Sequence, residues 1–423
     1  MDEGNRRIAS RVCPFSDEAP TEDDLGTPTA QGNELPWDKR LGYHSQVLAG
    51  RHVSDDYLMG SSSGGLTSWV LEQLLARGAV DGVIHVGRTD GPGTLFNYQE
   101  SDGPAEARHH RKSQYYATTM EDVLARARKS NRRYALVGVP CFIKAARALC
   151  REDSVLNDRL VVFVGLVCGH LKSHFFAESL AWQLDVHPGK LESVDFRMKH
   201  AGRPAGDYDF GARADQAVDV VRGRTRELVG GNWGHGAFQP EACNFCDDVF
   251  AETADVAFGD AWLPEYSSDW RGTNVVVTRS ELIDDILRAG NDSGEILTEA
   301  IATGRAAESQ AGNFRHRRDG LAVRLADDKR SGLSVPIKRV EPRWNHVSAR
   351  RRRLIRQRRL MSRRSFDLYV AARERSDLNV YLHGMQSMIR RYRRIESPGW
   401  RRFGGRVKRL FKGIVSSRQG RRT

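Results

Sequence analysis

Two apolar runs that each end at a cysteine constrain the fold of this chain more than any other feature. The runs YALVGVPC (134–141) and RLVVFVGLVC (159–168) have the length and composition of buried strands, and a helical pattern separates them. Strands that alternate with helices predict an α/β sheet with at least some parallel strands. The two strands would then deliver Cys141 and Cys168 to the same edge of that sheet.

Further strand and helix patterns extend this alternation over much of residues 43–290. Helical patterns cover 66–77, 119–129, 142–151, 173–184 and 280–290, whereas strand patterns cover 80–87, 134–139, 159–166, 254–262 and 273–280. The intervening residues 190–230 are strand-like and rich in turns. We therefore expect an α/β fold with a mixed, partly parallel sheet flanked by helices.

The two ends of the chain differ from this core in composition. Residues 1–40 are polar and rich in Pro, Gly, Asp and Glu, which predicts an extended N-terminal arm. Residues 343–423 hold 25 of the 66 Lys and Arg but only 4 of the 54 Asp and Glu, so the net charge of +12 conceals an acidic core and a basic tail. We expect this C-terminal tail to be largely helical or disordered.

Cysteine usage and hydropathy indicate the compartment. The six cysteines are too few for a disulfide scaffold in a chain of 423 residues. The first twenty residues are polar and do not resemble a signal peptide, and the longest apolar stretch, around 160–168, is too short to span a membrane. We expect a cytoplasmic protein, which could also associate peripherally with the inner membrane surface through its basic tail.

A close pair of cysteines, Cys243 and Cys246, adds two thiols to the two at the strand ends. In a reducing compartment such a Cys-x-x-Cys pair more often binds metal than forms a disulfide. Four thiolates from three places could hold a structural zinc ion or a cubane iron–sulfur cluster, and the spacing does not decide between them. Taken singly, Cys141 and Cys168 are better explained as buried thiols, and Cys150 as a structural residue on a helix face.

A glycine- and serine-rich turn precedes the first helical pattern. It comprises Gly60, Ser61, Ser62, Ser63, Gly64 and Gly65. Glycines let the backbone approach an anion, hydroxyls donate hydrogen bonds, and a helix N-terminus adds partial positive charge, so the turn could hold a phosphate. The sequence supports equally well a helix-capping loop in which Ser62 or Ser63 is the N-cap.

The histidines do not identify a catalytic pair. His170 and His174 lie near Cys168 and are the better candidates for a functional role. The polar or turn-rich surroundings of the other candidates predict surface positions, and these are His109, His110, His200 and His235. Since no Ser-His-Asp, HExxH or paired-carboxylate pattern is found, the catalytic residues stay unassigned.

The basic tail has the composition of an interaction surface. Arginines crowd residues 350–364 and 390–409, and aromatic and aliphatic residues lie among the second group. This mixture suits an anionic membrane surface or an acidic protein partner, with nucleic acid less favoured. A solvated extension without a partner explains the composition equally well.

Several segments, taken in their order and spacing, resemble one known family. They are GSSSGGLTSWVLEQLLARGAVDGVI (60–84), RKSQYYAT (111–118), YALVGVPCFIKAARAL (134–149), GLVCGHLKS (165–173), VDFRMKHAGRP (194–204) and CNFCDDVFAETADVAFGDAW (243–262). Together they resemble the beta subunits of coenzyme F420-reducing hydrogenases and F420-dependent formate dehydrogenases. The likeness covers roughly residues 42–290 and extends to chlorophyll-pathway reductases and to proteins encoded beside polysaccharide genes.

The resemblance implies an iron–sulfur flavoprotein with FAD and a 4Fe-4S cluster, and coenzyme F420 as a co-substrate. Gly60 to Gly65 would line the flavin pyrophosphate, and Lys112 and Ser113 match a stretch that contacts the flavin. Cys141, Cys168, Cys243 and Cys246 match the cysteines of the cluster. Such a protein would pass hydride or electrons between a reduced deazaflavin or ferredoxin and an acceptor that the sequence does not name.

An alternative function stays open within the same fold. The basic tail and the lack of a substrate motif are compatible with a non-redox or accessory protein of cell-surface polysaccharide biosynthesis, with a structural metal in place of the cluster. The resemblance divides the chain into four parts. They are an arm like the end of a ferredoxin-like module (1–41), a flavin-binding region (42–130), a catalytic and cluster-binding domain (131–315) and the Arg-rich tail (316–423).

Two positions depart from the family pattern. Cys13, in Arg-Val-Cys-Pro, looks like the last cysteine of a ferredoxin-like module, so we expect either that the module has decayed or that the true start lies upstream of Met1. Phe142 follows Cys141 where relatives often have glutamine, which puts a hydrogen-bonding role at that position in doubt.

Overall fold

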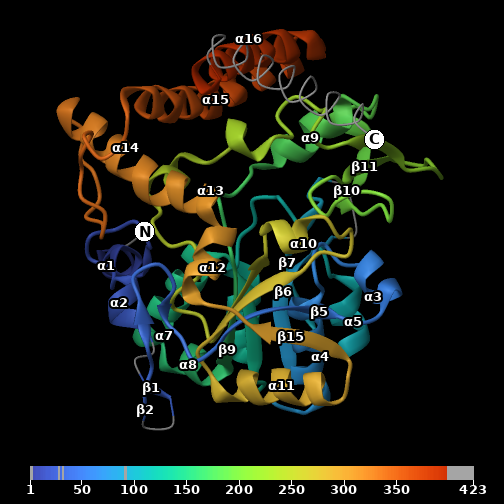
Figure 1. Ribbon diagram of the computed structural model, residues 1–423, viewed down its shortest axis with the longest axis vertical. Helices are drawn as coiled ribbons and strands as arrows, with labels where there is room; N and C mark the ends of the chain where they lie inside the picture. Colours follow the sequence, from blue (N-terminus) through green and yellow to red (C-terminus); the bar gives the residue numbers. More distant parts are fainter. Residues whose placement is uncertain (1–2, 27–28, 31–32, 90–92, 398–423) are drawn as a thin grey trace, which may run out of the picture.

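An eight-stranded mixed sheet forms the centre of the protein (Figure 1). The computed structural model describes residues 3–26, 29–30, 33–89 and 93–397. The strand order is β15-β5-β14-β13-β9-β8-β6-β7. The strands are β5 (Val47–His52), β6 (Gly82–Arg88), β7 (Phe96–Ser101), β8 (Tyr134–Gly138), β9 (Leu160–Leu166), β13 (Val256–Asp260), β14 (Asn274–Thr278) and β15 (Ile296–Ala300).

The middle of this sheet is parallel and its flanks are antiparallel. β13 pairs with β9, β9 with β8, and β8 with β6, all in parallel. β14, β5 and β15 on one side and β7 on the other pair antiparallel. The predicted α/β class with a mixed, partly parallel sheet is therefore confirmed, and the β8–β9 pair places the residues after both strands at one edge.

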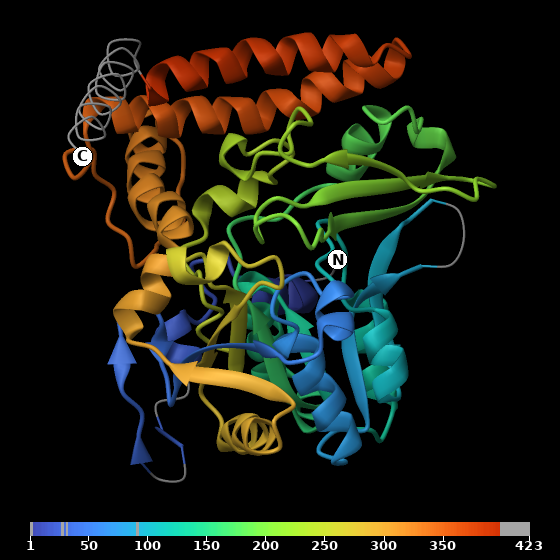
Figure 2. The ribbon, with the colours of Figure 1, turned by 45° about the vertical axis from the view of Figure 1, so that its right-hand side comes forward.

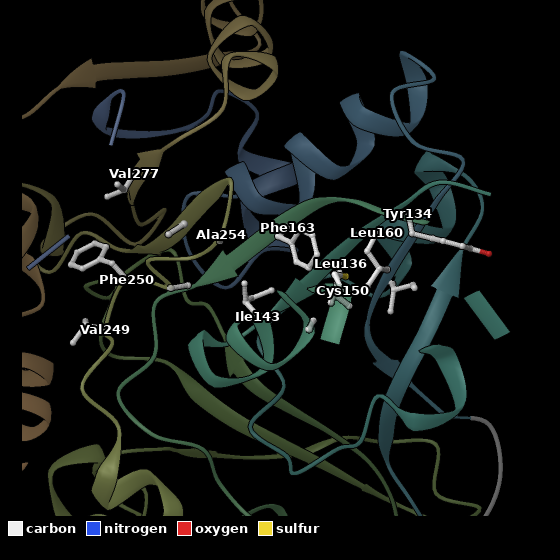
Figure 3. Packing of buried hydrophobic residues seen from close by; sticks show 14 of the residues in the cluster. Tyr134, Leu136, Ile143, Cys150, Leu160, Phe163, Val249, Phe250, Ala254 and Val277 are labelled. Carbon is white, nitrogen blue, oxygen red and sulfur yellow. The ribbon is translucent and has the colours of Figure 1, made fainter. Parts of the chain in front are cut away.

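Helices cover both faces of the sheet and bury two apolar clusters. On one face α6 (Glu121–Lys129), α7 (Pro140–Glu152) and α8 (Ser154–Arg159) pack against β8 and β9, where Ile143 and Cys150 approach Phe163 (Figure 3). On the other face α4 (Leu66–Ala76) and α11 (Glu281–Asp292) pack against the same strands. Cys150 thus lies in the core, as expected for a structural cysteine.

A second layer lies above the sheet and consists of a small sheet and a helical hairpin (Figure 2). β10 (Leu191–Met198), β11 (Asp209–Ala214) and β12 (Val221–Arg224) form a three-stranded antiparallel sheet beside α9 (His174–Trp182). The hairpin consists of α15 (Ala349–Glu374) and α16 (Leu378–Glu396). Tyr369 and Tyr381 of this hairpin are fully buried against Phe238, so the described part of the basic tail is an integral helical element.

Two segments differ from the sequence-based expectation. The N-terminal arm is not wholly extended, because residues Glu3–Val12 form the helix α1, and Arg11 at its end makes two hydrogen bonds of 2.8 and 2.7 Å with Glu152 of α7. The core also continues beyond residue 290, since β15 adds an antiparallel edge strand beside β5. Both elements depend on long-range pairing, which local patterns do not reveal.

The remaining elements are short or connect the two layers. The helices are α2 (Glu22–Leu25), α3 (Asp55–Met59), α5 (Pro104–His109), α10 (Pro264–Ser267), α12 (Thr303–Ser309), α13 (Ala311–Phe314) and α14 (Gly320–Arg330). The single-turn helices are η1 (Pro188–Lys190), η2 (Trp233–His235), η3 (Glu241–Phe245) and the π-helical η4 (Arg315–Asp319). The short strands are β1 (Thr29–Ala30), β2 (Asn33–Glu34), β3 (Trp37–Asp38) and β4 (Gly42–Tyr43). The four-part domain division stays a prediction.

Candidate functional site

The two strand-end cysteines lie at the carboxyl edge of the parallel strands. Cys141 is the second residue of α7, which begins two residues after the end of β8, and Cys168 lies two residues after the end of β9. The Cys168 amide donates to the Val249 carbonyl oxygen at 3.2 Å, which joins the end of β9 to the loop after the cysteine pair. The topology therefore brings the predicted thiols to one edge, as the sequence pattern indicates.

The cysteine pair reaches the same place from the η3 turn. Cys243 is 5% and Cys246 is 7% exposed. The backbone N–H of Leu171, three residues after Cys168, donates to the Cys243 sulfur at 3.3 Å. This hydrogen bond links the pair directly to the loop that follows β9.

The four thiols influence one another electrostatically. Burial raises the pKa of each thiol, to about 11 for Cys168 and about 12 for Cys246. The pKa of Cys141 is raised well above its usual value by burial and further by each of the other three cysteines. Within the described ranges no group of three or more His, Cys, Asp or Glu side chains is arranged to hold a metal ion as it stands.

A buried arginine that the sequence reasoning missed lies among these thiols. Arg317, in the π-helical turn η4, is 2% exposed. Its Nη2 donates to the Cys168 sulfur at 3.3 Å and its Nε to the Gly169 carbonyl oxygen at 3.0 Å. No local pattern could have identified it, because about 150 residues separate the two contacting segments, although π-helical turns often mark functional positions.

A buried network of charges borders the cysteines on the side of Cys141 and Cys246. Glu252 is 3% exposed and accepts from Arg339 at 2.7 Å and from Arg318 at 3.2 Å. Burial, followed by the neighbouring Glu252, raises the pKa of Asp248 to about 7. Since Arg339 comes from the C-terminal part of the chain, this network ties the loop of the cysteine pair to the segment before the hairpin.

The glycine–serine turn does not cap α4 in the expected way. Gly65 is the N-cap residue, with φ 78°, and the Leu66 N–H donates to Asn274 Oδ1 at 3.0 Å. Ser62 Oγ accepts from the Ser113 N–H at 2.9 Å, and Ser63 Oγ donates to the Thr273 carbonyl oxygen at 3.2 Å. The prediction that Ser62 or Ser63 is the N-cap is therefore wrong, because a positive φ at the N-cap position requires the glycine.

Of the two residues predicted to contact the flavin, Ser113 is hydrogen-bonded to this turn and Lys112 to the neighbouring strand β10. Ser113 is bonded to Ser62, and Lys112 Nζ lies 2.6 Å from Asp195 Oδ2 of β10. Lys112 adopts φ 90°, a left-handed conformation that is strained for a residue with a side chain. A Cβ on Gly60 would overlap the guanidinium of Arg111, whose Nε would lie 2.8 Å away, so Gly60 leaves room for that cation.

A cavity of about 210 Å³ opens between the turn and β10. Its lining is mainly cationic and polar: Gly60, Arg88, His109, Arg111, Lys112, Gln114, Val194 and Asp195. Within the described residues neither Arg88 nor Arg111 pairs with a carboxylate: Arg88 Nη2 donates to the Val194 carbonyl oxygen at 3.2 Å, and Arg111 Nη1 donates to the Tyr57 carbonyl oxygen at 3.4 Å. The cavity is smaller than the roughly 300 Å³ of a pocket that encloses a whole cofactor, and it suits an anionic fragment.

A lysine absent from the predicted site residues holds the turn from behind. Lys199 Nζ donates to the carbonyl oxygens of Leu58 and Ser63 at 2.8 Å each and to that of Arg271 at 2.5 Å. Burial and then the charge of Arg197 lower the pKa of Lys199 to about 7. Through these hydrogen bonds the Lys199 side chain fixes the backbone of the turn.

Aromatic rings connect the cavity with the cysteines. Tyr115, one residue after the cavity-lining Gln114, contacts Trp233 with ring centroids 4.7 Å apart. Trp233 in turn contacts His170 at 4.6 Å, two residues after Cys168. The two candidate sites are thus joined by contiguous side chains rather than separated by solvent.

The histidine predictions are confirmed only in part. His170 is 3% exposed and lies two residues after Cys168, and burial lowers its pKa well below the usual value. His235, which the sequence places on the surface, is 6% exposed, because the hairpin residue Tyr392 packs against its ring. His109 and His200 are exposed as expected.

Several arginines of the tail hairpin form ion pairs with carboxylates of the rest of the protein. Arg359 pairs with Asp328 at 2.7 Å and with Glu241 at 2.6 Å, and Arg373 pairs with Glu178 at 2.6 Å. Arginines that stay exposed gather at the end of α16: Arg390, Arg391, Arg393 and Arg394. Among the helices that the structure describes, none combines the length and apolarity needed to cross a membrane. The tail beyond residue 397 lies outside the described residues.

Comparison with known proteins identifies two family models in this chain. Residues 47–125 match the model of the coenzyme F420 hydrogenase/dehydrogenase beta subunit N-terminus, and residues 131–303 match that of its C-terminus. Arg317 lies outside both matches.

Two relatives extend this finding. The chain is 32% identical over 242 residues to one subunit of the F(420)H(2) dehydrogenase of Methanosarcina mazei, an alignment that covers 57% of this chain and 62% of the relative. It therefore spans less than two thirds of that relative. A chain of the F420-reducing NiFe hydrogenase complex from Methanosarcina barkeri superposes with a TM-score of 0.53 over 72% of this chain and 99% of that chain, at 16% identity, which shows a shared fold.

Proposed function

Because the chain belongs to the family of coenzyme F420 hydrogenase and dehydrogenase beta subunits, we propose that it is the deazaflavin-oxidising or deazaflavin-reducing subunit of an electron-transfer enzyme. It would exchange hydride with coenzyme F420 and electrons with a redox partner, using FAD and a 4Fe-4S cluster. The observation that carries this proposal is the convergence of four cysteines from three segments around one buried arginine.

The four cysteines fit a cluster by their chemistry. Cys141, Cys168, Cys243 and Cys246 would be its ligands, and a bound cluster would supply single-electron transfer. Buried thiols with raised pKa values bind metal only when their protons are displaced, so loading of the site releases protons. The Leu171 N–H and the Arg317 guanidinium already point hydrogen bonds at two of the sulfurs.

The cavity fits the anionic part of a flavin dinucleotide. Gly60, Arg111 and Lys112 would face the pyrophosphate, and Lys199 would hold the turn in place from behind. A flavin bound here would supply hydride chemistry at its ring, while the protein orients the ring and excludes water. The ring contacts from Tyr115 through Trp233 to His170 support this proposal, because they form a packed connection between the cavity and the loop of Cys168.

Anaerobic purification of the full chain tests the proposal. We expect a coloured protein whose iron and flavin contents are stoichiometric and whose visible absorption bleaches on reduction with dithionite or reduced F420. A colourless protein with stoichiometric zinc would refute the redox function and would favour the alternative of a structural metal.

Serine substitutions separate ligands from other buried cysteines. Cys243→Ser should lose most of the iron while keeping its far-ultraviolet circular dichroism. Cys150→Ser is the matched control, because Cys150 is also buried, at 8% exposure, but packs in the apolar core. Equal iron loss in both variants would contradict the assignment of the ligands.

The partner of the basic surface stays a prediction. The exposed arginines at the end of α16 are compatible with an acidic redox partner or with an anionic membrane surface. Co-sedimentation with vesicles that contain anionic lipid, at low and high salt, distinguishes the two. Salt-sensitive binding supports membrane association, whereas its absence leaves the protein partner.

A further inference from the structure

We propose that Arg317 is the fixed counter-charge of the four-cysteine centre and that it sets the reduction potential of the cluster bound there. The inference rests on the proposed function, because only a redox-active centre has a potential to set. It concerns a residue outside both family matches, which end at residue 303.

The surroundings of Arg317 contain sulfur where an arginine usually has carboxylate. Among the described residues Arg317 takes part in no carboxylate ion pair, whereas its neighbour Arg318 pairs with Glu252 at 3.2 Å. Its Nη2 donates a hydrogen bond to the Cys168 sulfur at 3.3 Å, in a loop that also brings the Leu171 N–H to the Cys243 sulfur. The charge of Arg317 is therefore directed at the thiols.

Two nitrogens of the Arg317 guanidinium form hydrogen bonds, and the third does not. Its Nε is fixed by the Gly169 carbonyl oxygen at 3.0 Å and its Nη2 contacts the Cys168 sulfur at 3.3 Å. Its Nη1 is buried and has no hydrogen-bond partner among the residues that the structure describes. A buried donor without a partner is costly, so this atom indicates that a further acceptor belongs beside it.

A buried cation of this kind needs negative charge nearby. Moving a charged side chain into the interior costs several kcal/mol unless an opposite charge compensates it. Protonated thiols do not provide that charge, whereas thiolates bound to a cluster do. The arrangement therefore fits a negatively charged centre, and it stabilises the reduced form more than the oxidised form because the reduced form carries one more electron.

The extra electron of the reduced cluster determines the direction in which the midpoint potential should shift. Removing the positive charge should make reduction harder, and so lower the midpoint potential. Arg317 acts through the ligand Cys168, so it is a positioning and charge-compensating residue rather than a catalytic one. A purely structural role would change stability and leave the potential where it is.

The test compares three variants of the full chain, purified anaerobically. Arg317→Met removes the charge, Arg317→Lys keeps it, and Arg318→Met removes a charge one residue away that faces a carboxylate. The midpoint potential is measured by redox titration followed by visible absorption and electron paramagnetic resonance, with iron content determined in each sample.

We expect Arg317→Met to lower the ratio of reduced to oxidised cluster about tenfold at a fixed potential, which corresponds to about 59 mV for one electron. Arg317→Lys should shift the potential less, and Arg318→Met hardly at all. Equal potentials in wild type and Arg317→Met, or equal shifts in Arg317→Met and Arg318→Met, would overturn the inference.

Iron retention and metal content distinguish failure of the inference about Arg317 from failure of the proposed function. If Arg317→Met cannot retain iron, retention in Arg317→Lys supports the need for charge, whereas equal loss in both overturns it. If wild type itself contains zinc instead of iron, the metal analysis refutes the proposed function, and the inference about the potential fails with it. Iron with an unchanged potential refutes the inference alone.

Discussion

Replacing Gly60 by alanine should weaken flavin binding by displacing Arg111, without unfolding the protein. Gly60 has φ −81° and ψ 1°, a negative-φ conformation that residues with a side chain also adopt. The added Cβ would lie 2.8 Å from Arg111 Nε and closer still to the end of the guanidinium. Because non-bonded contacts need about 3.5 Å, the guanidinium must retreat by an ångström or more.

The size of the loss in affinity follows from the hydrogen bond that this movement of Arg111 breaks. A hydrogen bond to a charged group contributes about 1.5–3 kcal/mol, so losing one between Arg111 and a phosphate should raise the Kd about 10- to 150-fold. Titration of flavin-free protein with FAD, and with ADP as a probe of the pyrophosphate alone, measures this change by calorimetry. The free energy of unfolding should change little, since a flexible side-chain end yields to the new methyl group.

A double-mutant cycle decides whether the effect passes through Arg111. Arg111→Ala should weaken binding about as much as Gly60→Ala, and the double variant should be no weaker than Arg111→Ala alone. If Gly60→Ala weakens binding by the same factor with and without Arg111, the substitution acts on the turn itself and the reasoning is refuted. Undiminished FAD and ADP affinity in Arg111→Ala would remove this cavity from the flavin site.

Three other predictions test the structure independently. Burial lowers the pKa of Lys199 to about 7, whereas a free lysine titrates near 10.4, so between these pH values the unfolded chain binds a proton that the folded chain has lost. The stability of wild type relative to Lys199→Met should therefore rise from pH 7 to pH 9. Urea unfolding measures this difference in stability, and a difference that stays constant with pH would contradict the prediction. An added Cβ on the exposed helical Gly304 would lie within 4 Å of no neighbouring atom of the described residues, so Gly304→Ala should stabilise the protein by up to about 1 kcal/mol. Gly290→Ala would drive a Cβ into the ring of Trp69 and should destabilise the protein by about 1–3 kcal/mol. Equal effects of the two substitutions in thermal unfolding would refute this packing. Tyr369→Ala should cost about 3–5 kcal/mol because the ring is fully buried, and a loss confined to the hairpin, seen by limited proteolysis with the core intact, would show that the hairpin folds separately.

Local patterns predicted the sheet core well because its strands are short, apolar and fully buried. The runs before Cys141 and Cys168 became β8 and β9, and the strand predicted over 273–280 became β14. Burial on both faces leaves a continuous apolar run in the sequence, and a parallel connection requires the intervening helix. The convergence of Cys141 and Cys168 at one edge follows from these two facts.

Other predictions failed where long-range contacts decide the conformation. Polar composition predicted an extended arm, but Arg11 pairs with Glu152 on a distant helix and stabilises α1. Serine composition predicted an N-cap, but Ser62 binds Ser113 instead. His235 is buried because α16 covers it, and nothing near it in the sequence indicates that cover.

Periodicity, spacing and residue chemistry are local properties, so the amino-acid sequence was enough to predict the α/β sheet and to single out the four cysteines and the glycine–serine turn. Folding of the whole chain established what surrounds these features. It placed Arg317 against Cys168, fixed the turn on Lys199 and fitted Arg111 over Gly60. Each of these contacts joins residues more than 50 positions apart, and a cation can reach a buried thiol at that separation only after the intervening chain has folded.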